Sequence, residues 1–186
     1  MRQPSSKYVR GITLIELVFT ITIGSILCAV SLPALGGLMQ SGQSRSAHNA
    51  LVAALNLARS TAVSRQSDIS ICPSRDGAAC DAAIWWQHGW IVFADANHDG
   101  VRGTNETLIH VGQSHDGMAI ASTAGRRHVI YRGDGTSAGS NLTFTFCDRR
   151  GASSADTVVI SNTGRIRSGK ATPAQAAAAC AGLPAP

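Results

Sequence analysis

The feature that most constrains this chain is an apolar run near its start that holds a single carboxylate. The run covers residues 12–35, and it exceeds the roughly 20 residues that a helix needs to cross a bilayer. Its one charged side chain is Glu16. A carboxylate at membrane depth is costly unless a cation pairs with it. The sequence therefore predicts a membrane-spanning helix in which Glu16 requires a positive partner.

The residues before this run have the character of a processed leader. Residues 1–11 are short and basic, and they end in Gly11. In an ordinary secretory signal the small cleavage residue follows the apolar stretch, whereas Gly11 precedes it. Cleavage after Gly11 would leave Ile12 as the new N-terminus and Glu16 as the fifth residue. This arrangement resembles the class III signal of type IV prepilins and type II secretion pseudopilins.

The resemblance implies a route to the membrane and into a fibre. A prepilin peptidase would cut after Gly11 and methylate the amine of Ile12, and Glu16 would pair with the N-terminus of a neighbouring pilin subunit during assembly. The chain would be a single-pass protein of the bacterial inner membrane before assembly, and then part of a pilus in the periplasm and at the cell surface. From the residues alone, a plain membrane anchor with a stray acidic residue remains the alternative.

A helical pattern continues through residues 36–65. Alanine and leucine recur there at spacings of three and four, which puts one apolar stripe along a helix. The opposite side is polar, so this amphipathic half is expected to pack on a globular head rather than in lipid. The stripe consists of Ala47, Ala50, Leu51, Ala54, Leu55, Ala58 and Ala62.

Residues 66–186 have a different pattern, in which short β-rich runs alternate with turns rich in Gly, Asp and Asn. Many short strands at regular spacing predict an antiparallel sheet or sandwich. The expected fold class is α+β, with a long N-terminal pilin helix packed on a β-rich head that ends in an Ala- and Pro-rich tail after Lys170. The expected strands cover residues 69–72, 90–94, 108–111, 118–121, 128–131, 142–147 and 157–160.

Of the five cysteines, Cys28 lies in the membrane helix and the other four lie in the head. An even number of cysteines in an exported domain favours disulfides, although the sequence alone leaves three pairings open. The pair Cys72–Cys80 closes the shortest loop, and it would leave Cys147–Cys180 as the second bridge. The four lack the closely spaced pairs that are typical of a zinc site.

Positive charge is concentrated in the last third of the chain. The formal net charge is +5, and the whole excess lies after Gly117, where eight Lys and Arg residues face three Asp residues. A basic face on an otherwise neutral head is typical of a surface that binds a polyanion, although a solvated face suits the charge equally well. The basic residues are Arg126, Arg127, Arg132, Arg149, Arg150, Arg165, Arg167 and Lys170.

A short element, Gly164-Arg165-Ile166-Arg167, gives this charge a more specific meaning. In an extended segment Arg165 and Arg167 point to the same side. Two neighbouring guanidinium groups can each donate bidentate hydrogen bonds to adjacent phosphates, while Gly164 lets the backbone turn or approach a polymer closely. The element resembles the DNA-binding motif of the FimT minor pilins, and residues 89–100 also resemble the FimT/GspH group.

This second resemblance implies a function in DNA uptake during natural transformation. Gly164, Arg165 and Arg167 would contact double-stranded DNA, largely without sequence preference. The weaker candidates Lys170, Arg149 and Arg150 are basic, but no motif specifies them. Trp85, Trp86 and Trp90 could stack on bases, although tryptophans of a small β-rich head belong more often to its core.

One loop has the ligand spacing of an EF-hand calcium site. Asp95, Asn97, Asp99, Gly100 and Glu106 match that spacing, with the glutamate eleven residues after the first aspartate. The flanking segments are predicted strands instead of the helices that an EF-hand requires. The same residue types also suit a tight connection between strands, and we therefore favour an acidic hairpin loop over a calcium site and expect no cofactor.

Three functions remain open at this level. The favoured one is a FimT-like minor pilin that binds DNA. The alternatives are a structural or priming minor pilin without DNA binding, and a GspH-like pseudopilin of a type II secretion system. We expect no enzyme, because the six histidines lack the His-Glu-x-x-His spacing and neither a nucleophile elbow nor a phosphate-binding glycine loop is present.

Overall fold

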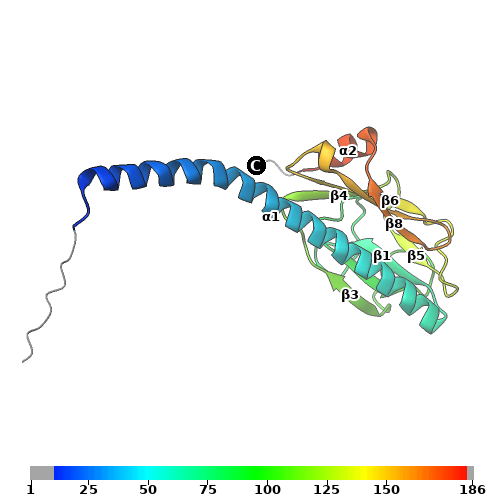
Figure 1. Ribbon diagram of the computed structural model, residues 1–186. Helices are drawn as coiled ribbons and strands as arrows, with labels where there is room; N and C mark the ends of the chain where they lie inside the picture. Colours follow the sequence, from blue (N-terminus) through cyan, green and yellow to red (C-terminus); the bar gives the residue numbers. More distant parts are fainter. Residues whose placement is uncertain (1–10, 184–186) are drawn as a thin grey trace, which may run out of the picture. The chain divides into compact units, whose positions relative to one another are not determined.

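The computed structural model describes residues 11–183, except for the side chains of residues 32–35. The predicted leader therefore lies outside the described residues apart from Gly11. Two compact units, residues 1–39 and 40–186, are described separately. One long helix, α1 (Leu14–Arg65), runs through both (Figure 1).

The first part of α1 has the properties of a membrane span. An 18-residue window of this part has a mean hydropathy of 2.1, and none of its residues is buried. By length and composition, the helix is long and apolar enough to cross a membrane. Its hydroxyl side chains bond back to the helix: Thr20 Oγ1 donates to the Leu17 carbonyl at 2.8 Å, and Thr22 Oγ1 donates to the Val18 carbonyl at 2.7 Å. At the helix start, the Glu16 amide donates to Thr13 Oγ1 at 3.3 Å, so Thr13 satisfies one of the amides that the first turn leaves free.

The second part of α1 belongs to the head. The predicted apolar stripe is buried there, apart from the partly buried Ala50: Ala47, Leu51 and Leu55 have no exposed surface, and Ala54 is 2 % exposed. These side chains enter one core cluster with residues of both sheets. The predicted amphipathic packing of this half is therefore confirmed.

Two four-stranded antiparallel sheets form the head, which confirms the predicted α+β class with a long helix on β-rich layers. Sheet A has the strand order β3-β2-β1-β5. Its strands are β1 (Ile69–Pro73), β2 (Trp90–Ala94), β3 (Leu108–Gly112) and β5 (Val129–Tyr131). Its residues Ile71, Val92 and Tyr131 face the same core cluster as α1.

Sheet B has the strand order β4-β6-β7-β8. Its strands are β4 (Met118–Ser122), β6 (Leu142–Asp148), β7 (Asp156–Ile160) and β8 (Ile166–Lys170), and a short 3-10 helix, η1 (Ala152–Ser154), precedes β7. Side chains alternate between the two faces of a strand. Even-numbered residues such as Ile120, Phe144 and Val158 enter the core with α1. Odd-numbered residues therefore form the opposite surface, which we call the outer face of sheet B.

The sequence left open how ordered the Ala- and Pro-rich residues after Lys170 are. Pro173–Cys180 form a second helix, α2, which packs on the outer face of sheet B by burying Ala179 with Ala121 and Cys147. Thr172 and Gln175 form a capping box at its start, in which each side chain bonds the backbone amide of the other residue. The sequence did not predict this helix, because alanine-rich segments carry little hydrophobic pattern.

Two disulfides tie the head together, and they are the pairs that the loop-length argument favours. Cys72–Cys80 closes a loop beside sheet A, and Cys147–Cys180 joins β6 to the end of α2. Cys28 is exposed on the apolar part of α1.

Candidate nucleic-acid interface

The turn between β7 and β8 presents the arginine pair. The Gly164 amide donates to the Ser161 carbonyl at 2.8 Å, and the Ser161 amide donates to the Arg165 carbonyl at 3.1 Å. Gly164 has a φ of +73°. A tight turn followed by a left-handed glycine is a common hairpin connection with a bulge. Gly164 is therefore required by the turn itself.

Arg59 of α1 holds this turn in place. Its Nε donates to the Gly135 carbonyl at 3.0 Å, and one of its terminal nitrogens donates to the Thr163 carbonyl at 3.2 Å. A Cβ on Gly164 would lie only 2.1 Å from the Gly135 carbonyl oxygen. The sequence reasoning did not single out Arg59, because its long-range carbonyl partners leave no local pattern.

Arg165 and Arg167 lie on the outer face of sheet B. Ile166, between them, packs against the core, so strand alternation directs both arginines the other way. Both are exposed, and neither forms an ion pair within residues 11–183. Arg167 on the edge strand β8, and Arg165 directly before that strand, thus present two guanidinium groups to solvent.

Lys170 lies on the opposite face of the same strand. It pairs with Asp156, its partner in the β7–β8 register, with an Nζ–Oδ1 distance of 2.7 Å. The two residues border a pocket of about 480 Å³ with His48, whose Nε2 lies 2.9 Å from Ser168 Oγ. Lys170 is therefore separated from the arginine pair by the thickness of the sheet, and its charge is balanced locally.

Arg149 and Arg150 lie beyond the far end of β6. Leu142, at the start of β6, aligns with Ile160, and Ile160 aligns with Ile166 at the start of β8. Arg165 directly precedes Ile166, so it lies at the end of sheet B where β6 starts. The seven residues from Leu142 to Arg149 span about 23 Å of strand. The structure therefore does not bring the two arginines together with the Arg165–Arg167 pair.

Arg150 is also engaged by a carboxylate. Its Nε and a terminal nitrogen donate to both oxygens of Asp148, at distances between 2.7 and 3.2 Å. Burial alone would raise the pKa of Asp148, but the hydrogen bonds and charge of Arg150 outweigh burial and lower that pKa. Arg150 is thus a local partner of Asp148, whereas Arg149 is exposed.

Two further cations lie at the same end of sheet B as the arginine pair. Arg126 follows Thr123, whose amide bonds the Thr143 carbonyl of β6 at 2.9 Å, and its guanidinium donates to the Gly139 carbonyl. Arg132 begins the loop that reaches the β7–β8 turn, where the Ser137 amide donates to the Asn162 carbonyl. Both arginines are exposed, so they extend the positive surface around Arg165.

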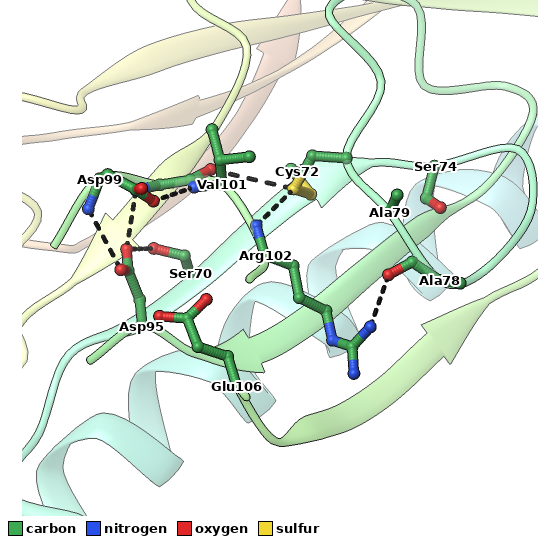
Figure 2. Close-up of a disulfide and its surroundings, with 12 residues drawn as sticks. Ser70, Cys72, Ser74, Ala78, Ala79, Asp95, Asp99, Val101, Arg102 and Glu106 are labelled. Atoms are coloured by element: carbon green, nitrogen blue, oxygen red, sulfur yellow. Dashed lines mark hydrogen bonds between the residues drawn. A yellow bond between two sulfur atoms is a disulfide. The ribbon is translucent and has the colours of Figure 1, made fainter. Parts of the chain in front are cut away.

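The acidic side chains of the loop between β2 and β3 accept hydrogen bonds from within the loop and from Ser70 of β1 (Figure 2). Asp95 Oδ2 accepts from Ser70 Oγ at 2.5 Å and from the Gly100 amide at 3.0 Å. The two oxygens of Glu106 accept from the Ala96 and Gly103 amides at 2.9 and 2.8 Å. Within residues 11–183 no three His, Cys, Asp or Glu side chains form a metal-binding group. The loop connects two antiparallel strands rather than two helices, and its acidic side chains already accept backbone and hydroxyl hydrogen bonds. Both observations favour the acidic hairpin loop over the calcium interpretation.

Two of the three tryptophans are core residues. Trp86 has no exposed surface and Trp90 is 1 % exposed, and both enter the cluster that α1 covers. Trp85 is half-buried and packs beside α2 with Ala121 and Ala179. Among the tryptophans, Trp85 alone borders the outer face of sheet B.

A long N-terminal helix followed by two antiparallel sheets defines the pilin fold, and comparison with known proteins gives the family. Residues 47–164 match the family described as type II transport protein GspH, and residues 6–32 match the prokaryotic N-terminal methylation motif. The chain belongs to the GspH family, which includes minor pilins and pseudopilins. The methylation motif implies processing by a prepilin peptidase and assembly with other pilin subunits.

Solved structures support the same fold. The type IV minor pilin FimU of Pseudomonas aeruginosa PAO1, in a P21 crystal, is 22 % identical with a TM-score of 0.52, over 76 % of this chain and 95 % of that one. In a P65 crystal FimU is 23 % identical with a TM-score of 0.51, over 73 % and 98 %. No curated protein is significantly similar in sequence. The GspH match ends at Gly164, so Arg165 and Arg167 lie outside it.

Proposed function

We propose that this minor pilin binds extracellular double-stranded DNA through Arg165 and Arg167, for DNA uptake in natural transformation. The observation that carries the proposal is the pair of exposed arginines at the start of the edge strand β8, with no ion-pair partner within residues 11–183. Guanidinium groups in this arrangement suit two neighbouring phosphates. Gly164 shapes the turn that presents them, and Arg126 and Arg132 add positive charge at the same end.

The expected affinity is low and strongly dependent on salt. Phosphate contacts carry no base information, so binding is largely independent of sequence. A surface with a handful of arginines gives a dissociation constant of roughly 1 to 100 µM at physiological salt. Such an affinity suits a fibre that captures and later releases its cargo.

The test is a titration of a head fragment, residues 40–186, into labelled duplex DNA at several salt concentrations. Every residue of the three core clusters lies within this fragment. Replacing both Arg165 and Arg167 with Ala is expected to abolish most binding and to reduce the slope of log K against log salt by about 2. Failure of the wild-type fragment to bind duplex at low salt would refute the proposal for an isolated subunit.

A matched control removes the same charge elsewhere. The variant Arg149→Ala/Lys170→Ala also loses two positive charges, but from the other end of sheet B. We expect it to bind DNA within about twofold of wild type, apart from the long-range charge effect that both variants share. Equal loss of binding in the two variants would mean that net charge, and not the arginine pair, determines affinity.

We also propose the finer details of processing and location. Cleavage after Gly11 and methylation of Ile12 leave a new N-terminus near Glu16. The Glu16 carboxylate then pairs with the N-terminus of a neighbouring subunit. The chain then resides in the inner membrane through the first part of α1 until it enters a pilus. Mass spectrometry of the mature chain tests the cleavage site and the methyl group.

The alternatives are a structural or priming minor pilin and a GspH-like pseudopilin of a type II secretion system. The match to the GspH family supports them as much as it supports a DNA-binding pilin. Absence of DNA binding would favour these two, and the role of the subunit would then lie in contacts with other pilins.

A further inference from the structure

A groove crosses the outer face of sheet B beside α2. It has a volume of about 360 Å³ and lies between the strands β4 and β6 on one side and α2 on the other. Pockets for small organic groups range from about 300 to 1,000 Å³, so the groove is large enough for one flat ring system. Its lining includes Trp85, Thr143, Thr145, Gln175 and Ala178.

The groove combines an aromatic and apolar lining with a few polar groups. Trp85 contributes a half-buried indole ring, and Ala178 contributes a methyl group from α2. Gln175 uses its Oε1 to accept from the Thr172 amide at 2.9 Å and from Thr172 Oγ1 at 3.1 Å. Its amide NH₂ therefore stays available as a donor. Thr143 and Thr145 add two hydroxyl-bearing side chains to the lining, although Thr145 is only 5 % exposed.

The strand register aligns this groove with the arginine pair. Thr143 aligns with Val159, and Val159 aligns with Arg167. All three have odd numbers and belong to the outer face of sheet B, so they form one row across β6, β7 and β8. Two strand spacings separate Thr143 from Arg167, which is about 10 Å. A group in the groove would thus lie within one or two nucleotides of a phosphate bound by the arginines.

We propose that this groove binds an unpaired nucleobase of a DNA strand whose phosphates lie on Arg165 and Arg167. The inference rests on the proposed function, because the arginines supply the backbone contact. Bases have a π-face that stacks on aromatic rings whatever their identity, and positively charged grooves with such rings are typical of single-strand binding. In a duplex the bases are stacked and paired, so they are hidden from the groove. The head therefore prefers single-stranded DNA, or frayed ends, over intact duplex.

Charge complementarity selects this occupant. An apolar peptide would fill the groove but would gain nothing from the guanidinium groups next to it. A nucleotide uses both features at once, because its base is flat and its phosphate is anionic.

The test compares labelled single-stranded and duplex DNA of equal length, with the full-length chain in non-ionic detergent. We expect wild type to bind the single strand about tenfold more tightly than the duplex. The variant Ala178→Leu fills the groove from an exposed position on α2 with a good helix former. It should lose about tenfold in single-strand affinity, with its duplex affinity unchanged.

The control is Ala177→Leu, the same substitution one residue earlier on α2. Ala177 is also exposed but does not line the groove, so both affinities should match wild type. A second measurement uses an oligonucleotide that contains 4-thiothymidine, followed by irradiation and mass spectrometry. A crosslink to Trp85 or Thr143 is expected. It supports the inference even if Ala178→Leu fails to fold.

The outcomes separate this inference from the proposed function. If wild type binds single-stranded and duplex DNA with equal affinity, or if Ala178→Leu loses affinity for both to the same extent, the groove does not bind a base. DNA binding by the arginine pair would remain intact in either case. Crosslinks only outside the groove, or none at all, overturn the groove inference as well. Absence of binding to either DNA refutes the proposed function and the groove together.

Discussion

The backbone of Gly164 offers a sharp test of how the arginine pair is held. We predict that Gly164→Ala destabilises the head far more than Gly117→Ala does. The two glycines have similar φ values, +73° and +78°, so both variants force an alanine into the left-handed region. They differ in space: a Cβ at Gly117 would have no neighbour within 4 Å, whereas one at Gly164 would lie 2.1 Å from the Gly135 carbonyl oxygen.

The magnitude follows from three costs: the backbone conformation, the crowding of the Cβ and the hydrogen bond at Gly135. Placing alanine in the left-handed conformation costs about 1–2 kcal/mol, and this is the whole expectation for Gly117→Ala. At Gly164 the Cβ must displace the Gly135 backbone, which adds about 1–3 kcal/mol of overpacking. The displacement also strains the hydrogen bond from Arg59 to the Gly135 carbonyl, which is worth about 1.5–3 kcal/mol because its donor is charged. Together, the overpacking and the loss of this hydrogen bond should make the variants differ by about 2.5–6 kcal/mol.

The assay is urea and thermal unfolding of the head fragment, followed by circular dichroism. A difference of about 3 kcal/mol corresponds to roughly 10 °C in Tm for a domain of this size. Gly164→Ala should also weaken DNA binding where the protein is still folded, because the turn that precedes Arg165 is rearranged. If both variants lose the same free energy of unfolding, the close approach of Gly164 to Gly135 is not rigid and our account of this turn is wrong.

Three further predictions test the rest of the head. Replacing Cys147 and Cys180 with Ser should lower the free energy of unfolding by about 4 kcal/mol. This loss is roughly 1 kcal/mol more than that from replacing Cys72 and Cys80, because the bridged residues are 33 rather than 8 apart. Urea titrations that give the opposite ranking would contradict this prediction. Arg59→Ala should lower the free energy of unfolding by about 2 kcal/mol, because its hydrogen bonds to the backbone carbonyls are lost. Its DNA affinity should fall as well, because the β7–β8 turn is loosened. A weaker affinity at unchanged stability would indicate instead that Arg59 itself contacts DNA. The head should be less stable at pH 5.5 than at pH 7.5, because burial lowers the pKa values of His48, His115 and His128 below the ordinary 6.5. As the pH drops below about 6.5, protons bind these histidines in the unfolded chain before they bind them in the folded head, so stability falls. Replacing all three histidines with Gln should flatten the dependence of stability on pH. An equally steep dependence in that variant would exclude the histidines as its cause.

Much of the fold follows from patterns that are local in the sequence. The stripe from Ala47 to Ala62 predicts the buried side of α1, because a helix repeats its faces every three or four residues. The strands of the core were predicted from short apolar runs between turns. Strand β8 was expected only as a short extended segment, because Arg, Ser, Gly and Lys give an edge strand no apolar pattern. The helix α2 was missed, although the sequence Thr172-Pro-Ala-Gln175 contains the signal of a capping box.

The candidate site was predictable in its chemistry but only partly in its membership. Arg165 and Arg167 are two residues apart, so strand geometry alone puts them on one side. Lys170 is an odd number of residues from both, and alternation directs it to the other face, where Asp156 pairs with it. Arg149 and Arg150 were grouped with the pair through charge alone, since distance along β6 cannot be estimated before the strand register is known.

By itself the sequence determined an N-terminal helix, with Glu16 in it, that is long and apolar enough to cross a membrane, the amphipathic continuation of that helix and the β-rich class of the head. Each of these depends on side-chain periodicity or on the cost of burying polar groups, and both act over a few residues. Only the tertiary structure decided that Arg59 anchors the β7–β8 turn, that the basic residues divide between two faces and two ends of sheet B, and that a groove under α2 aligns with Arg167. These features depend on strand register and on contacts between residues as far apart as Arg59 and Thr163, which no local pattern encodes.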